Sequence, residues 1–189
     1  MAPSLGNFAL WLSLFFAISQ FFVSKINNLK LIKISVNGLL ISSLISFFLL
    51  MFSYVVSDFS VLNVFENSHT TKPLLYKISG VWGNHEGSLL LWLLVLTLFI
   101  FIFLIKSREL LKKYRILTVL FQQIIIIGFF IFLIKSSNPF NYLFPVPKEG
   151  MGLNPILQDP ALAIHPPILY LGYVGSSIIF SSVLAATTL

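Results

Sequence analysis

Five stretches of this chain are apolar, uncharged and long enough to cross a lipid bilayer as helices, which requires about 20 residues. They are residues 5–23, 34–56, 88–105, 116–134 and 167–189. Charged residues make up only 10% of the chain, against about 25% in a soluble domain, so too few polar side chains exist to cover a water-facing surface. The sequence therefore predicts an all-α membrane protein with about five transmembrane helices in a single integral membrane domain, residues 1–189.

The charges between the apolar stretches indicate how the chain is oriented. The two short loops contain eight basic residues and one acid, namely Lys25, Lys30, Lys33, Lys106, Arg108, Lys112, Lys113 and Arg115 with Glu109. The two long loops, 57–87 and 135–166, together contain four basic and five acidic residues. The positive-inside rule places the short loops in the cytoplasm or the mitochondrial matrix. We therefore expect the N-terminus and both long loops to face outward, and we attribute the net charge of +6 to this topology rather than to nucleic-acid binding.

A glycine-rich run, GVWGNHEGS over residues 80–88, ends the first long loop directly before the third apolar stretch. Gly87, or the serine after it, can cap the helix that begins there, and Glu86 lies near the positive end of that helix dipole. Glycine also lets the backbone approach other atoms closely, so we expect Gly83 and Gly87 to be structural. An interfacial His is commonly a hydrogen-bonded structural residue, so for His85 we expect an orienting role rather than metal ligation.

The second long loop leads into HPPILY over residues 165–170. Proline is favoured at the first position of a helix, and the residue before a proline is pushed towards extended geometry. We therefore expect the fifth helix to begin near Pro167 and His165 to lie outside it, with Pro166 and Pro167 fixing the direction of its imidazole. Such an imidazole can be an axial ligand of haem iron, or it can cap the helix or anchor it at the lipid headgroups. Residue chemistry alone leaves both roles open.

Several function classes are excluded or disfavoured. The chain has no Cys, which excludes disulfides, thiolate metal sites and a Cys nucleophile, and it lacks the glycine-rich nucleotide-binding motifs and HExxH. No charged residue lies within the apolar stretches, which disfavours an ion channel or a transporter. Trp82 and Trp92 suit an aromatic belt at the membrane interface and by themselves indicate no ligand.

Two long motifs resemble the signature segments of CcmF, the haem-lyase component of cytochrome c maturation. They are WGNHEGSLLLW over residues 82–92 and LNPILQDP over 153–160, the second continuing into HPPILYLGYVG over 165–175. The resemblance runs in order along nearly the whole chain, which is similar to an N-terminal part of CcmF of the split mitochondrial type. Asn84 stands where the family usually has a small residue.

The resemblance implies a subunit of the cytochrome c haem lyase. Such a subunit helps to hold haem b, a transiently bound substrate, while its vinyl groups form thioethers with apocytochrome c on the outer side of the membrane. In the family the His of the HPP run is one of two outward-facing ligands of the haem iron, and His165 inherits that role. The residues expected near the haem are Trp82, His85 and Glu86, and those expected to be structural are Gly83, Gly87, Pro166 and Pro167.

The family's tryptophan-rich WWD segment and its other haem-binding His residues have no counterpart in this sequence. We therefore expect a chain that is not catalytic alone and that needs the remaining CcmF polypeptide, a CcmH-type thiol protein, the haem chaperone CcmE and apocytochrome c. A bias towards residues with AT-rich codons, such as Phe and Ile, favours the mitochondrial inner membrane, with the bacterial inner membrane as the alternative. The alternative function is a structural subunit of a larger inner-membrane assembly, without haem chemistry.

Overall fold

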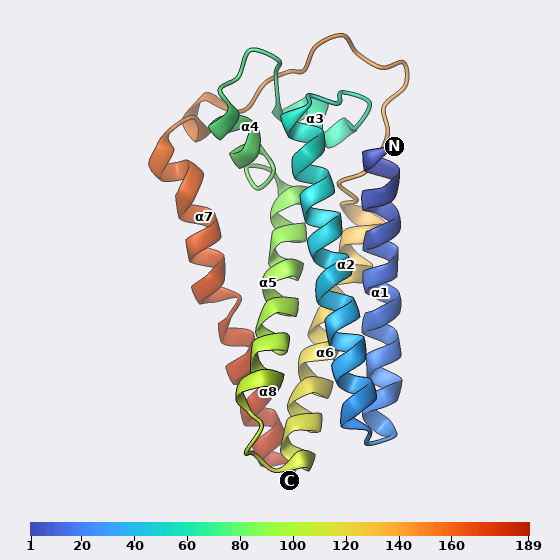
Figure 1. The fold of residues 1–189 in the computed structure, drawn as a ribbon. Helices are drawn as coiled ribbons and strands as arrows, with labels where there is room; N and C mark the ends of the chain where they lie inside the picture. The colour runs from blue at the N-terminus through green and yellow to red at the C-terminus, as the bar shows by residue number, and fades with distance from the viewer.

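The computed structural model describes residues 1–189 as a bundle of long helices without a β-sheet (Figure 1). The helices of membrane-spanning length and hydropathy are α1 (Ala2–Lys25), α2 (Leu29–Val55), α5 (His85–Lys106), α6 (Lys112–Ser136) and a final pair, α7 (Pro160–Tyr173) and α8 (Ser176–Thr187). A turn at Val174 and Gly175 separates the two helices of this pair, which together form one membrane-length segment. The predicted all-α membrane fold with five membrane-length helical segments is confirmed.

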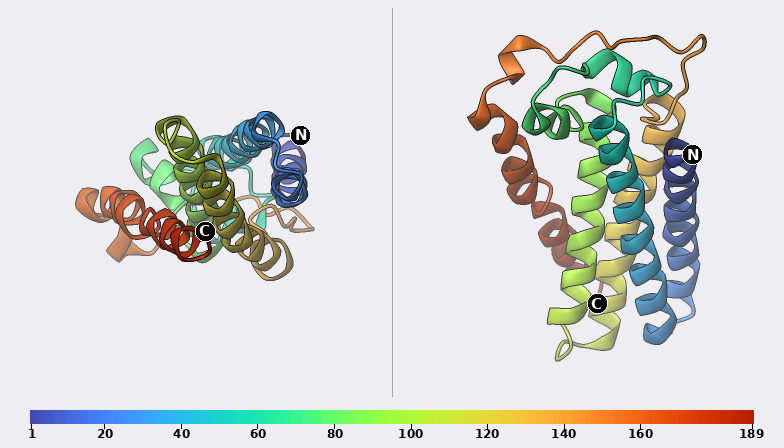
Figure 2. Two further views of the ribbon diagram at one scale, coloured as in Figure 1. Left: turned by 90° about the horizontal axis from the view of Figure 1, so that it is seen from below. Right: turned by 45° about the horizontal axis from the view of Figure 1, so that its top comes forward.

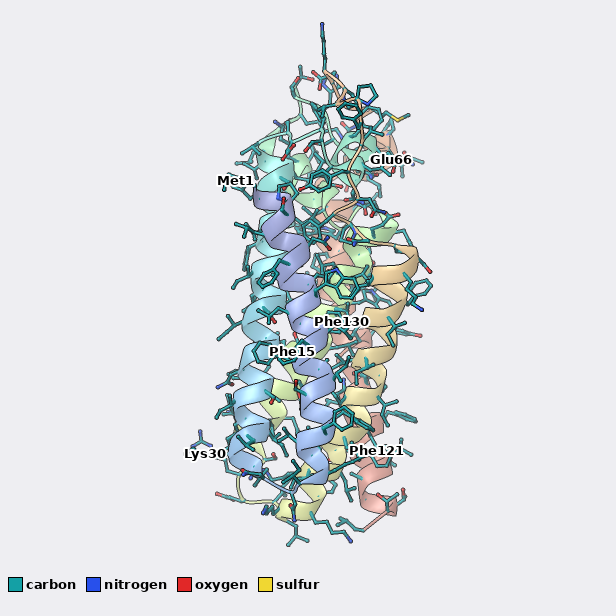
Figure 3. All side chains as sticks on the ribbon, turned by 90° about the vertical axis from the view of Figure 1, so that its right-hand side faces the viewer. Met1, Phe15, Lys30, Glu66, Phe121 and Phe130 are labelled. Carbon is teal, nitrogen blue, oxygen red and sulfur yellow. The ribbon has the colours of Figure 1, made fainter.

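The helices pack side by side, with α1 and α2 adjacent at one edge and α7 at the opposite edge (Figures 1 and 2). Ser13 of α1 donates to Ser42 Oγ of α2 over 2.8 Å, and small residues of this kind let helix backbones approach closely in a membrane. Phe130 of α6 is fully buried inside the bundle, whereas Phe15 of α1 is largely exposed at its outer surface (Figure 3). The outer apolar side chains therefore face the lipid.

Two buried polar side chains of α6, Gln122 and Arg115, form hydrogen bonds with residues of neighbouring segments. Gln122 donates to Ser177 Oγ of α8 over 2.8 Å. Arg115 donates to Ser107 Oγ over 3.1 Å and to the backbone oxygen of Leu104 over 3.0 Å. That oxygen is one of the last carbonyls of α5, which lack partners within the helix, and a cation is favourable at that end of the helix dipole. Arg115 thus belongs to α6 rather than to a loop, and it caps the end of α5.

The helices α2, α5 and α7 begin earlier than their apolar stretches, and a polar side chain caps each of them. Asn28 accepts hydrogen bonds from the backbone N–H groups of Lys30 and Leu31, so α2 begins at Leu29 rather than at residue 34. The basic side chains in its first turns are compatible with a membrane helix because their long aliphatic stems can carry the charge to the membrane surface.

The two long loops cover the same end of the bundle and pair with each other (Figures 1 and 2). The short helices that they contain are α3 (Leu62–Asn67), α4 (Leu74–Gly80) and the 3-10 helix η1 (Pro155–Leu157). Leu62 N donates to Asn141 O and Leu143 N donates to Ser60 O, each over 2.8 Å. The loops therefore form one layer over the helix ends. The side of the membrane that this end faces stays a prediction.

Glu149 of the second loop binds the first loop through Thr70. Its carboxylate accepts hydrogen bonds from Thr70 Oγ1 and from the backbone N–H of Thr70, the latter over 2.9 Å. The backbone N–H of Gly150 donates to it over 3.0 Å, and His69 Nδ1 lies 3.8 Å away. Hydrogen bonds to a carboxylate favour its charged form. Those from Thr70, with smaller contributions from Gly150 and His69, lower the pKa of Glu149 from its ordinary 4.5 to about 2.

We expect the attachment of the two loops to depend on pH. Because the pKa of Glu149 is about 2 in the folded protein and 4.5 ordinarily, its contribution to stability is complete above pH 4.5 and is lost as the pH falls through 2. The hydrogen-exchange protection of the Thr70 amide, corrected for the intrinsic exchange rate, should fall across this window. In Glu149→Gln the protection should be low throughout and lack the step. Glu66→Gln, a change of an exposed acid in the first loop, should keep the step, and a step that survived in Glu149→Gln would contradict the assignment.

Candidate functional site

A cavity of about 470 Å³ lies between the beginning of α5, the segment 153–157 and α7, at the end of the bundle that the loops cover. Residues from both long motifs line it. They are Trp82, Gly83, Asn84, His85, Ser88, Leu89 and Trp92 on one side and Leu153, Leu157, Leu162, Ala163, Pro166 and Tyr170 on the other. Two segments that are far apart in the sequence thus meet here, which makes the cavity the candidate functional site.

Asn84 starts α5 and organises the glycine-rich turn. Its Oδ1 accepts from the backbone N–H of Gly87 over 2.8 Å, the usual N-cap arrangement. Its Nδ2 donates to Gly80 O over 2.7 Å and to the Tyr54 hydroxyl over 3.0 Å. The prediction that Gly87 or the following serine caps the helix is wrong, because the cap needs a side-chain oxygen and Gly87 contributes the amide that this oxygen receives. Asn84 is therefore the residue that holds the turn together.

Glu86 lies in the first turn of α5, as predicted, where a carboxylate is favourable beside the helix dipole. It does not line the cavity. Its Oε2 accepts from Asn63 Nδ2 over 3.1 Å, and the same Nδ2 lies 2.8 Å from Asn84 Oδ1. The backbone oxygen of Asn63 in turn accepts from the Tyr54 hydroxyl over 2.9 Å. Glu86 thus belongs to a network that holds α3 and the end of α2 against the start of α5, and nothing in the sequence pattern pointed to Asn63 or Tyr54.

The start of α7 differs from the prediction that the fifth helix begins near Pro167 with His165 outside it. The helix begins at Pro160, and His165, Pro166 and Pro167 all lie inside it. Asp159 accepts from two backbone N–H groups of the first turn, over 2.8 and 3.1 Å, and so caps the helix. Proline at the first helical position costs no hydrogen bond. The Asp–Pro pair is therefore a complete helix start that precedes the HPP run.

The prolines inside α7 leave backbone oxygens without their helical donors. A proline has no N–H, so Pro167 leaves the oxygen of Ala163, four residues earlier, unpaired within the helix. Trp82 Nε1 donates to this oxygen over 2.8 Å. The indole of the first motif thus satisfies a carbonyl that a proline of the second motif releases, and it fixes α7 against the glycine-rich turn.

The two His residues of the motifs lie in different surroundings. His85 lines the cavity at the first position of α5, and its ring lies edge-on to that of Phe132 with centroids 6.2 Å apart. The residues of α7 that face the cavity recur at a spacing of three or four, which is one helix face. His165 does not line the cavity, and the side chains of both His residues are exposed. The structure therefore does not bring His85 and His165 to one cavity.

An aromatic cluster surrounds Trp92, which lines the cavity together with Tyr170. The Trp92 ring lies 5.5 Å from that of Tyr170, 5.7 Å from that of Phe129 and 6.3 Å from that of Tyr173, measured between centroids. The Tyr170 hydroxyl donates to Ser88 Oγ over 3.4 Å. The sequence pattern did not single out Tyr170 and Tyr173, although their spacing of three residues places them on one face of a helix.

Comparison with known proteins identifies the family. Residues 82–189, which contain both long motifs, match the family described as "Cytochrome C assembly protein". The chain is 48% identical over 193 residues to the cytochrome c-type biogenesis protein CycK of Rhizobium meliloti, covering 98% of this chain and 29% of that protein. It is 40% identical over 194 residues to the cytochrome c-type biogenesis protein CcmF of Haemophilus influenzae, covering 98% of this chain and 30% of that protein.

A solved structure described as "Cytochrome c Heme Lyase CcmF" has the same fold, with a TM-score of 0.83 at 24% identity, covering 100% of this chain and 31% of that chain. The chain thus spans about three tenths of the length of the relatives that it matches. The family match covers more than half of the chain and includes both sides of the cavity. This chain therefore belongs to the cytochrome c assembly protein family.

Proposed function

We propose that this chain is a subunit of a cytochrome c haem lyase and helps to hold haem while it is attached to apocytochrome c. Its relatives are cytochrome c biogenesis proteins, which supports a role in the same process. The chemistry joins each haem vinyl group to a cysteine thiol of apocytochrome c, the sulfur bonding to one vinyl carbon and the thiol hydrogen passing to the other. This chain contributes no cysteine, so its own part is to bind and orient.

The observation that carries the proposal is the exposed position of His165 on α7, next in sequence to Pro166, which lines the cavity that both motifs form. Haem that is received from one protein and passed to another requires a ligand that both partners can reach, and a buried imidazole would prevent this exchange. A single imidazole suffices as an axial ligand of haem iron. No group of three His, Cys, Asp or Glu residues lies close enough together to hold a bare metal ion, which agrees with a ligand whose porphyrin supplies the other iron bonds.

In this proposal the cavity positions the helix that carries His165. Trp82 Nε1 donates to the backbone oxygen of Ala163. About two turns after Ala163 on α7, the ring of Tyr170 packs against that of Trp92. Trp82 and His85 line the cavity, and we propose that they would lie near a haem held by His165. Glu86 acts through Asn63 on the turn rather than on the haem itself. The residues proposed to be structural are Gly83, Gly87, Pro166 and Pro167.

The proposed partners follow from the length of the relatives. Because the chain spans about three tenths of them, we propose that a polypeptide carrying the WWD segment completes the haem site, and that a CcmH-type thiol protein, the haem chaperone CcmE and apocytochrome c bind there. The distribution of basic residues supports an outward orientation of the loop-covered end. The membrane is proposed to be the mitochondrial inner membrane or, as in the bacterial relatives, the bacterial inner membrane.

Isolation of the tagged chain from its own membranes tests the proposal. We expect a WWD-containing polypeptide among the accompanying proteins, identified by mass spectrometry, together with a haem absorbance band in the same fraction. The chain expressed without that partner should retain little haem and mature no cytochrome c. A stable assembly with neither the WWD segment nor haem would favour the alternative, a structural membrane subunit without haem chemistry.

We expect Trp82→Phe to loosen α7 and to lower the haem content of the assembly several-fold. The change keeps an aromatic ring but removes the N–H that satisfies the buried Ala163 oxygen, and an unsatisfied buried acceptor costs about 1–3 kcal/mol. Hydrogen exchange of the α7 amides and the haem absorbance per protein would measure both effects. Trp92→Phe is the matched control, because Trp92 lines the same cavity through ring packing. Equal effects of the two variants would contradict a specific role for the Trp82 hydrogen bond.

A further inference from the structure

A second cavity, of about 230 Å³, lies between α2 and α5 at the end of the bundle opposite the haem-lyase motifs. It is lined by Lys33, Val36, Asn37, Phe101, Leu104, Ile105 and Arg108. We propose that this cavity binds the phosphate of an anionic phospholipid. The proposal does not depend on the haem function or on which way the chain crosses the membrane.

Two cations, Lys33 and Arg108, line this cavity, and no carboxylate lines it. Lys33 lies near the start of α2 and Arg108 in the turn after α5, and both line the same hollow. The one ion pair of the chain joins His69 and Glu149 in the long loops, so neither cation has a carboxylate partner. Like charges that share a small space repel each other, and a bound phosphate would remove this repulsion. The amide of Asn37 adds a neutral hydrogen-bond donor.

Arg115 lies in the same region but, unlike Lys33 and Arg108, is buried and already hydrogen-bonded within the protein. It is 5% exposed and already donates to Ser107 and to the end of α5, so it is committed to the fold. Lys33 and Arg108 are exposed at the bundle surface. They therefore remain available to a ligand that arrives from outside the chain.

The apolar half of the cavity favours a lipid over free phosphate. Val36, Phe101, Leu104 and Ile105 supply four of the seven lining residues. The exposed side chains of Ile102 and Ile105 give this end of α5 an apolar outer surface. A phosphodiester between the two cations would thus have its acyl chains against an apolar helix surface. Basic pockets between transmembrane helices are known to hold anionic lipid headgroups.

Lipid binding by the full chain, purified with any polypeptide that accompanies it, tests the proposal. Native mass spectrometry in detergent would compare retained phosphatidylglycerol with phosphatidylcholine. We expect a clear preference for phosphatidylglycerol. In Lys33→Gln/Arg108→Gln the binding should weaken roughly 25-fold, and in Lys33→Gln alone about fivefold, since each cation near an anionic lipid contributes a factor of about five.

The matched control is Lys30→Gln/Lys112→Gln, which removes the same charge from the same end of the bundle at residues that do not line the cavity (Figure 3 shows Lys30 there). It should change binding by less than about twofold. Thermal melting would confirm that both double variants are folded. Equal weakening in the two double variants would show general attraction to the membrane and overturn the site. Displacement of the lipid by millimolar inorganic phosphate would overturn the lipid as its ligand.

Discussion

The substitution His165→Ala should abolish haem retention by the assembled complex while the five membrane helices stay folded. We propose the His165 imidazole as an axial ligand of the haem iron, and even the outer partners of metal ligands change affinity by about 10–100-fold when removed. The loss of haem should therefore exceed about tenfold. Because His165 is exposed on α7, the change should alter the stability of the fold by no more than about 0.5 kcal/mol. The haem absorbance of the purified assembly and its melting temperature measure the two effects.

Added imidazole should partly restore the haem band, since it can occupy the vacant coordination position, and this rescue separates ligand loss from damage to the fold. His69→Ala is the matched control, because His69 lies in the loop layer beside Glu149 and should leave the haem content unchanged. His85→Ala should have an intermediate effect through the cavity that it lines. An assembly with His165→Ala that kept its haem spectrum and its cytochrome c output would leave His165 a surface residue and favour the structural-subunit alternative.

The membrane helices are predictable from the sequence because the bilayer imposes one dominant requirement, an apolar run of about 20 residues. Their boundaries are set by single polar residues outside those runs, such as Asn28 and Asn84. Two prolines in this region can begin a helix, Pro160 in the second loop and Pro167 directly after it. Only the carboxylate of Asp159 distinguishes them, since it supplies the cap that makes the earlier start complete. An argument from proline alone therefore places His165 outside the helix, where it does not lie.

The meeting of the two motifs depends on long-range packing, which sequence spacing does not encode. A proline inside a helix indicates locally that the carbonyl four residues earlier needs another donor, so the requirement at Ala163 follows once α7 is known to begin at Pro160. The donor could not be named in advance, because Trp82 reaches that oxygen only through the way α7 crosses the start of α5. The hydrogen bond from Asn63 to Glu86 was likewise not predictable, because it joins residues that only long-range packing brings together.

The substitution Gly87→Ala should prevent the glycine-rich turn from forming and give the largest loss of stability of any single methyl addition in this site. A Cβ at Gly87 would clash with the backbone oxygen of Val81 and lie 2.8 Å from its carbonyl carbon. That carbonyl cannot move aside freely, because Asn84 Nδ2 donates to it over 3.2 Å and to the Gly80 oxygen over 2.7 Å. Relief of the clash would also break the Asn84 cap on the Gly87 amide. Overpacking and loss of the cap together should cost more than about 3 kcal/mol.

The comparison with Gly128→Ala makes this expectation sharp. Gly128 lies within α6, and a Cβ there would meet nothing within 4 Å. The same methyl group should therefore leave the melting temperature in detergent unchanged or raise it slightly, because the higher helix propensity of Ala adds up to about 1 kcal/mol of stability. Gly87→Ala should lower the melting temperature and the yield of folded protein, and any folded fraction should have lost haem, since Trp82 and His85 flank the turn. Two variants of equal stability would mean that the turn can open at little cost. The Asn84 network would then not be what holds α5, the cavity and α7 together.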